Sequence, residues 1–170
     1  MTLNELGTNG QVTVDKPVNV LSAARQLVER SGRTLTNLQL HKILYLAQMY
    51  HLGERKTRLI NGDFEAWDYG PVLPVLYSQA KIFGGGPVLR VFGAGEIFDP
   101  ERGKWLEDAY DQLGKLSAGR LVSITHMKDG AWATYYRPNM HGIKIPDEAI
   151  IDEYRLRKQR VIDARQAAAG

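Results

Sequence analysis

The chain has 170 residues, of which 44% are hydrophobic and 24% charged, so it is long enough to form one domain with a substantial apolar core. It contains no cysteine, which excludes disulfide bonds, thiolate nucleophiles and cysteine-based zinc sites. The formal net charge is +3, and residues 1–16 lack the pattern of an export signal, so we expect a cytoplasmic protein without a membrane span.

The first third of the chain predicts two helices after a polar start. Residues 1–16 are polar and contain two glycines, so we expect a flexible lead-in. Residues 17–32 begin at Pro17, end at Gly32 and carry apolar side chains at helical spacing, which predicts a helix with one buried face. Thr36 and Gln39 form a capping box, which marks the start of a second and longer helix.

The second helix is expected to be the central one. It extends to a glycine stop at Gly53. Apolar side chains occur around most of its circumference, which is typical of a helix covered on several sides. Its main apolar stripe consists of Leu40, Ile43, Leu44, Ala47 and Tyr50.

A small β element and a short helix are expected next. The sequence from Arg58 to Trp67 predicts a short strand or a hairpin, with Asn61 and Gly62 as its turn. Proline disfavours helical geometry in the preceding residue, so the next helix should begin at Pro74 itself. The glycine-rich residues 84–98 favour a mobile loop or a short edge strand.

The C-terminal half predicts three further helices. The first begins with Asp99 as its cap and Pro100 as its first residue, and the second begins at Ser117. The third begins after Pro146, with Asp147 as its cap.

We find no internal repeat and no domain linker. The expected fold class is therefore mainly α, a single compact domain of about six helices with a small β-hairpin or short strands. We place the domain at residues 17–155 and interpret residues 156–170 as a basic C-terminal helix end or tail.

The histidines do not predict a metal site. His41 and His51 are ten positions apart, about 80° out of register on an ideal helix, whereas a zinc pair needs a spacing of three or four. We expect both to flank the apolar stripe and to make local hydrogen bonds. Serine-nucleophile and nucleotide-binding motifs are also missing, so we expect no cofactor.

The segment around Trp67 is the strongest candidate for a functional site. Glu65 and Asp68, with His126, would be the acid and base groups of an enzyme. In an extended segment, however, Glu65 and Trp67 share one face and Asp68 lies on the other, which argues against paired catalysis. We expect Asp68 to accept backbone hydrogen bonds in a turn. Trp67 and Tyr69 either fill the core or anchor a binding surface.

The C-terminal segment is basic. Arg155, Arg157, Lys158 and Arg160 are candidate nucleic-acid-binding residues, and this predicts an alternative function as a nucleic-acid-binding regulator. The other interpretation is a solvated helix end, where cations suit the negative end of the helix dipole.

Three motifs, in order and spacing, resemble the SocA-like antitoxin family, whose shared unit is called the Panacea domain. The resemblance covers roughly residues 18–155. It is carried by Lys42, Leu44, Tyr45, Ala47, Gln48 and His51; by Ala66, Trp67, Tyr69, Gly70, Pro71 and Val72; and by Thr125, His126 and Trp132.

The resemblance implies an antitoxin rather than an enzyme. Members of the family are encoded beside toxins, also in prophages, and neutralise them by direct contact. In the founding system the antitoxin is a proteolytic adaptor that delivers its toxin to the ClpXP protease. A cognate toxin, and ClpXP with it, are therefore the expected partners. The candidate partner-binding residues are Trp67, Asp68, Tyr69, Pro71, His126 and Trp132.

Overall fold

The structure is a computed structural model that describes residues 15–170. The lead-in expected over residues 1–16 therefore lies almost entirely outside the described residues. The described part is mainly helical with one small antiparallel sheet, which confirms the predicted fold class. Its helices are α1 (Val20–Arg30), α2 (Asn37–Arg55), α3 (Pro74–Ala80), the 3₁₀ turn η1 (Lys81–Phe83), α4 (Pro100–Leu113), α5 (Ala118–Thr125), α6 (Ala131–Tyr135) and α7 (Asp147–Ala169).

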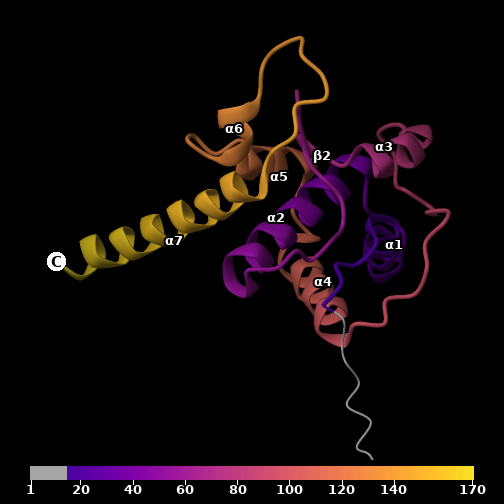
Figure 1. Cartoon of the computed structure of the whole chain (residues 1–170), viewed down its shortest axis with the longest axis horizontal. Helices are drawn as coiled ribbons and strands as arrows, with labels where there is room; N and C mark the ends of the chain where they lie inside the picture. The colour runs from indigo at the N-terminus through magenta and orange to yellow at the C-terminus, as the bar shows by residue number, and fades with distance from the viewer. Residues whose placement is uncertain (1–14) are drawn as a thin grey trace, which may run out of the picture.

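The long helix α2 lies in the centre of the molecule (Figure 1). Thr36 and Gln39 form the predicted capping box at its start. The helix packs against α1, α4, α5 and α7, so nearly every side chain from Leu40 to Gly53 is buried. Tyr50 is the exception, because it is 46% exposed and packs edge-on against Tyr154 at a centroid distance of 5.9 Å. Its assignment to the buried stripe was wrong.

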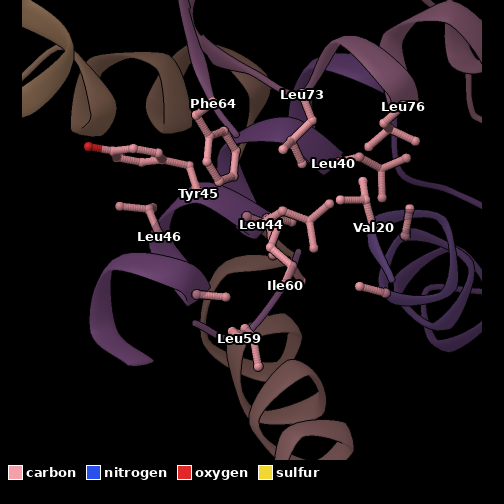
Figure 2. Packing of buried hydrophobic residues seen from close by; sticks show 14 of the residues in the cluster. Val20, Leu40, Leu44, Tyr45, Leu46, Leu59, Ile60, Phe64, Leu73 and Leu76 are labelled. Carbon is pink, nitrogen blue, oxygen red and sulfur yellow. The ribbon is translucent and has the colours of Figure 1, made fainter. Parts of the chain in front are cut away.

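The core is built around the side chains of α2. In Figure 2, Leu44 lies beside Ile60, and Phe64 lies beside Tyr45. The rings of Phe64 and Tyr45 meet edge to face with their centroids 5.2 Å apart. The amide oxygen of Gln48 accepts the backbone N–H groups of Leu59, at 2.8 Å, and of Ile60, at 3.0 Å. This buried amide ties the extended segment after α2 to the centre of the core.

The sheet has two strands, β1 (Glu65–Trp67) and β2 (Gly70–Val72), joined by a turn at Asp68 and Tyr69. The predicted turn at Asn61 was wrong. The side chain of Asn61 instead accepts the N–H of Val20 at 3.2 Å, at the start of α1. Gly70 has a φ of 104°, and a Cβ there would lie 2.8 Å from the Cε of Lys42, so this turn requires glycine.

The helix starts agree with prediction in part. Helix α3 begins at Pro74, and Asp99 and Ser117 cap α4 and α5. Helix α1 begins at Val20 rather than Pro17, because the side chain of Asn19 caps it. Asp147 does not cap α7 but is its first residue, and its carboxylate pairs with Arg58 at 2.6 Å.

Two segments add detail that was not predicted. Helix α6 follows Gly130 and is only five residues long. Residues 84–98 form a loop attached to the core at several points: the N–H of Val88 donates to the carbonyl of Leu35 at 2.8 Å, and the N–H of Gly95 donates to Oγ of the buried Ser22 at 3.0 Å. Val88 is fully buried there.

Helix α7 extends beyond the rest of the molecule at its C-terminal end (Figure 1). Val161 and Ile162 are 51% and 43% exposed. The expected division between residues 155 and 156 falls inside this continuous helix. In the described residues, no helix has the length and apolar character needed to cross a membrane.

Candidate binding pocket

A pocket of about 370 Å³ opens where the start of α2, the hairpin turn, α3 and the loop before α7 come together. This size is in the range of ligand-binding pockets. Its lining residues are Thr36, Asn37, Leu38, His41, Trp67, Asp68, Tyr69, Val72, Tyr77, Gly84, Gly85, Ala118, Met140 and His141.

The walls and the rim of the pocket are aromatic and apolar. Trp67 and Tyr77 meet edge to face, with ring centroids 4.8 Å apart. The indole N–H of Trp67 donates to Glu65 Oε2 at 2.9 Å, so these two side chains share one face of β1, as predicted. Tyr69 and Met140 are 70% and 56% exposed. Trp67 is half-buried, and the rim therefore presents apolar side chains to solvent.

His41 is buried at this pocket and is only 1% exposed. Its Nδ1 accepts the backbone N–H of Leu73 at 3.1 Å, so the proton of the neutral ring is on Nε2. Burial, aided by the positive charge of Lys42, lowers the pKa of His41 from 6.5 to about 3. The imidazole is therefore neutral at physiological pH and presents Nε2–H as a hydrogen-bond donor.

Lys42 lies behind the hairpin and is fully buried. Its Nζ donates to the carbonyl oxygen of Pro71 at 2.9 Å. Burial lowers the pKa of Lys42 from 10.5 to about 7. Pro71, a candidate partner-binding residue, is itself buried in β2, so its described contact is internal.

His126 and Trp132 form an aromatic stack next to the hairpin. Their rings are parallel within 6° and their centroids are 3.6 Å apart, and Tyr136 continues the stack at 4.7 Å from Trp132. The indole N–H of Trp132 donates to the carbonyl oxygen of Trp67 at 2.8 Å. Trp132 is only 9% exposed, so it supports the hairpin from inside. Burial, with Lys42, lowers the pKa of the half-buried His126.

Asp68 is exposed, and its carboxylate accepts the hydroxyl of Tyr136 at 2.7 Å. In the described residues this side-chain contact replaces the backbone hydrogen bonds expected for Asp68, because the carboxylate points toward α6. Of the three groups considered for an enzyme, Asp68 lines the pocket, whereas Glu65 and His126 do not. The structure therefore does not bring these three groups together at the pocket.

The histidines lie in different surroundings. The partner of His41 is Leu73, 32 residues away, so the expected local hydrogen bond was wrong for this residue. His51 does make a local contact, between its Nδ1 and the carbonyl oxygen of Thr57 at 2.7 Å. Over residues 15–170, no group of three or more histidine, aspartate or glutamate side chains is arranged to hold a metal ion.

Comparison with known proteins assigns the chain to a family. Residues 40–133, more than half of the chain, match the family described as Antitoxin SocA-like, Panacea domain. The chain belongs to this family. It is also 30% identical over 162 residues to Antitoxin SocA from Caulobacter vibrioides (strain NA1000 / CB15N), covering 85% of this chain and 86% of that protein. No solved structure matches the chain.

The matched part of the Panacea domain contains His41, Lys42, the hairpin and Trp132. The pocket residues Asn37, Tyr77 and Met140 were not predicted as site residues. Asn37 and His41 are four positions apart on α2, a spacing that places two side chains on one helix face. The four-residue spacing of Asn37 and His41 is visible in the sequence. The sequence does not show that the helix face carrying them meets the hairpin.

The four basic candidate residues on α7 each lie beside an acidic side chain. Arg157 is the most constrained, because it also donates to the carbonyl oxygen of Ile124 at 2.6 Å. Nucleic-acid binding stays a prediction, with less free positive charge to support it. The pairs are Arg155–Asp152, Arg157–Glu153, Lys158–Glu54 and Arg160–Asp129.

Proposed function

We propose that this protein is an antitoxin that neutralises a cognate toxin by direct protein–protein contact, with the pocket and its rim as the contact surface. Membership of the SocA-like family supports the role. The observation that carries the choice of surface is the exposed rim of Tyr69 and Met140 around a concave, aromatic pocket. Binding energy concentrates where aromatic anchors meet pockets, and this surface offers both.

Neutralisation by masking follows from the size of such an interface. A stable protein–protein interface buries about 1,600 Å² in total, far more than the pocket alone. The toxin would therefore cover the hairpin turn, α3 and the loop around Met140 as well. A toxin surface held in this contact cannot reach its target at the same time. This role would place the protein in the cytoplasm together with its toxin.

The test is co-expression with the product of the adjacent reading frame, followed by co-purification and a growth assay. We expect a stoichiometric complex and restored growth. Tyr69→Ala should weaken the complex at least about tenfold, because it removes an exposed aromatic anchor. Phe98→Ala is the matched control, since Phe98 is 86% exposed and lies away from the pocket. Toxicity unchanged by the wild-type chain would refute the proposal.

A further step is delivery of the bound toxin to ClpXP, as the resemblance to the family implies. Degradation and masking differ in one measurable quantity, the half-life of the toxin. With purified ClpXP, an adaptor shortens that half-life, whereas a purely masking antitoxin leaves it unchanged or longer. Tyr69→Ala should abolish any acceleration, because delivery requires the same contact.

A further inference from the structure

Two polar atoms on one face of α2 are buried without a hydrogen-bond partner in the described residues. They are Oδ1 of Asn37 and Nε2 of His41, and both residues line the pocket. Nearly all buried polar groups in native proteins are paired, so two together need an explanation. Asn37 offers an acceptor and His41 a donor, one helical turn apart. One hydroxyl group can accept from the donor and donate to the acceptor.

The pocket favours an uncharged occupant. Asp68 is its charged lining residue, and this carboxylate already accepts the hydroxyl of Tyr136. No lysine or arginine is among the described residues that line it, so a phosphate or carboxylate would find no counter-ion. Of the two lining histidines, His41 cannot supply the charge, because its buried ring is neutral at physiological pH, and His141 is exposed to solvent rather than buried with an occupant. A charged group would therefore lose hydration without compensation.

The walls favour an aromatic ring that is attached to a larger molecule. Trp67 and Tyr77 present faces and edges suited to edge-to-face contacts with a third ring. Leu38 and Val72 add aliphatic contacts, and the volume of about 370 Å³ accommodates one large side chain. The apolar lining continues outward onto the exposed Tyr69, which suits a protein surface better than a free small molecule.

We propose that the pocket binds a tyrosine side chain of the toxin, with its ring against Trp67 and its hydroxyl accepting from Nε2–H of His41 and donating to Oδ1 of Asn37. The identity of the partner as a toxin rests on the proposed function; the preference for a phenol does not. Phenylalanine would leave both buried polar atoms unpaired, and the indole N–H of tryptophan could satisfy Asn37 alone. The hydroxyl group is therefore the specificity determinant.

A first test needs no toxin. The compounds p-cresol and toluene are the side chains of tyrosine and phenylalanine, and each is titrated into ¹⁵N-labelled protein. We expect p-cresol to shift the indole N–H signal of Trp67 and to bind at least about tenfold more tightly than toluene, since two hydrogen bonds distinguish them. The indole of Trp105, which donates to the carbonyl of Ala47, is the internal control.

His41→Asn tests the role of the donor. An asparagine oxygen can replace Nδ1 as the acceptor for Leu73, while the Nε2–H donor is lost. The variant should bind toluene as the wild type does and lose its preference for p-cresol. Equal affinities of the two compounds for the wild type, or a preference that survives in the variant, would overturn the proposal.

A second test uses the co-expressed toxin and a residue that fills the pocket. A Cβ at Gly85 or at Gly119 meets no atom within 4 Å, but only Gly85 lines the pocket. Both tryptophan variants should fold with an unchanged melting temperature. Gly85→Trp should weaken toxin binding at least about tenfold, and Gly119→Trp should not.

The outcomes separate the two proposals. If the wild type binds the toxin and Gly85→Trp binds it equally well, the pocket is not the site and this inference fails, while the antitoxin role stands. If the wild type binds no toxin but prefers p-cresol in a His41-dependent way, the antitoxin role fails and the phenol site stands.

Discussion

Tyr45 on α2 donates a hydrogen bond of 2.7 Å to Glu153 on α7, although 108 residues separate them in the sequence. The Glu153 side chain is buried, and it also accepts the guanidinium of Arg157 and the backbone N–H of Ala131. A buried carboxylate is stable only when it is paired in this way. The contact therefore fixes α7 on the central helix.

Replacing Tyr45 by phenylalanine should destabilise the protein while keeping its shape. We expect a loss of about 1.5–3 kcal/mol in the free energy of unfolding, because the charged acceptor loses one donor. Urea unfolding at neutral pH measures it. Tyr50→Phe is the control, since Tyr50 is 46% exposed, and its loss should be within about 0.5 kcal/mol. Equal losses in the two variants would show that Glu153 does not need Tyr45.

Acid should destabilise the protein through His41. The pKa of His41 is about 3 in the folded chain against an ordinary value of 6.5, so the unfolded chain takes up its proton first as the pH falls. Stability is therefore lost below about pH 6.5. Between about pH 7 and about pH 5, His41→Asn should lose about 2 kcal/mol less than the wild type. His51 and His126 also have lowered pKa values, but they remain in both proteins and cancel in the comparison. Parallel stability curves of the wild type and the variant would therefore contradict the assignment to His41.

Lys42 should make the wild type more stable as the pH rises above neutrality. Its pKa is about 7 in the folded chain against an ordinary value of 10.5, so the unfolded chain holds the extra proton between these values. Between about pH 7.5 and about pH 9.5 we expect a gain of about 2–3 kcal/mol. Lys42→Met, which keeps most of the length of the side chain, should show a nearly flat profile in urea unfolding. A rising profile in Lys42→Met would assign the effect to another group.

Trp132 and Tyr69 should separate stability from binding. Trp132 is 9% exposed, stacked and hydrogen-bonded to the hairpin, so Trp132→Ala should cost about 3–5 kcal/mol in thermal or urea unfolding. Tyr69 is 70% exposed, so Tyr69→Ala should change stability by less than about 0.5 kcal/mol. A large stability loss in Tyr69→Ala would mean that its effect on toxin binding reports folding instead.

The basic end of α7 is tested by substitution rather than by deletion, because removing residues 156–170 would also remove Arg157 from the buried Glu153. We expect the variant with Gln at Arg155, Lys158 and Arg160 to match the wild type in stability and in a gel mobility shift with DNA. Each charge already lies beside an acidic group. A wild-type shift that weakens with salt and disappears in the variant would favour the nucleic-acid alternative.

The local chemistry of the fold was predictable where neighbouring residues decide it. The capping box at Thr36, the start of α3 at Pro74 and the cap at Asp99 all depend on side chains within three positions of one another. Asn61 was misread as a turn residue because its partner, Val20, is 41 residues away. Local pattern cannot show which distant N–H group an asparagine will meet.

The candidate site was predictable in its hairpin half, because Trp67, Asp68 and Tyr69 were all candidate residues and all line the pocket. Trp67 and Tyr69 were recognised as core or surface anchors, and the structure makes one half-buried and the other exposed. His41 was interpreted as a residue beside an apolar stripe. Its role depends on the packing of the hairpin against the start of α2, which creates both the acceptor contact to Leu73 and the pocket.

The contact between Tyr45 and Glu153 also sets an order of events on the ribosome. At about 5–20 residues per second, the 108 residues that separate the partners take roughly 5–20 s to synthesise. During that interval the apolar surface of α2 that α7 later covers is open to chaperones and proteases. A nascent chain therefore gains its full protection against degradation only after translation has passed Arg157.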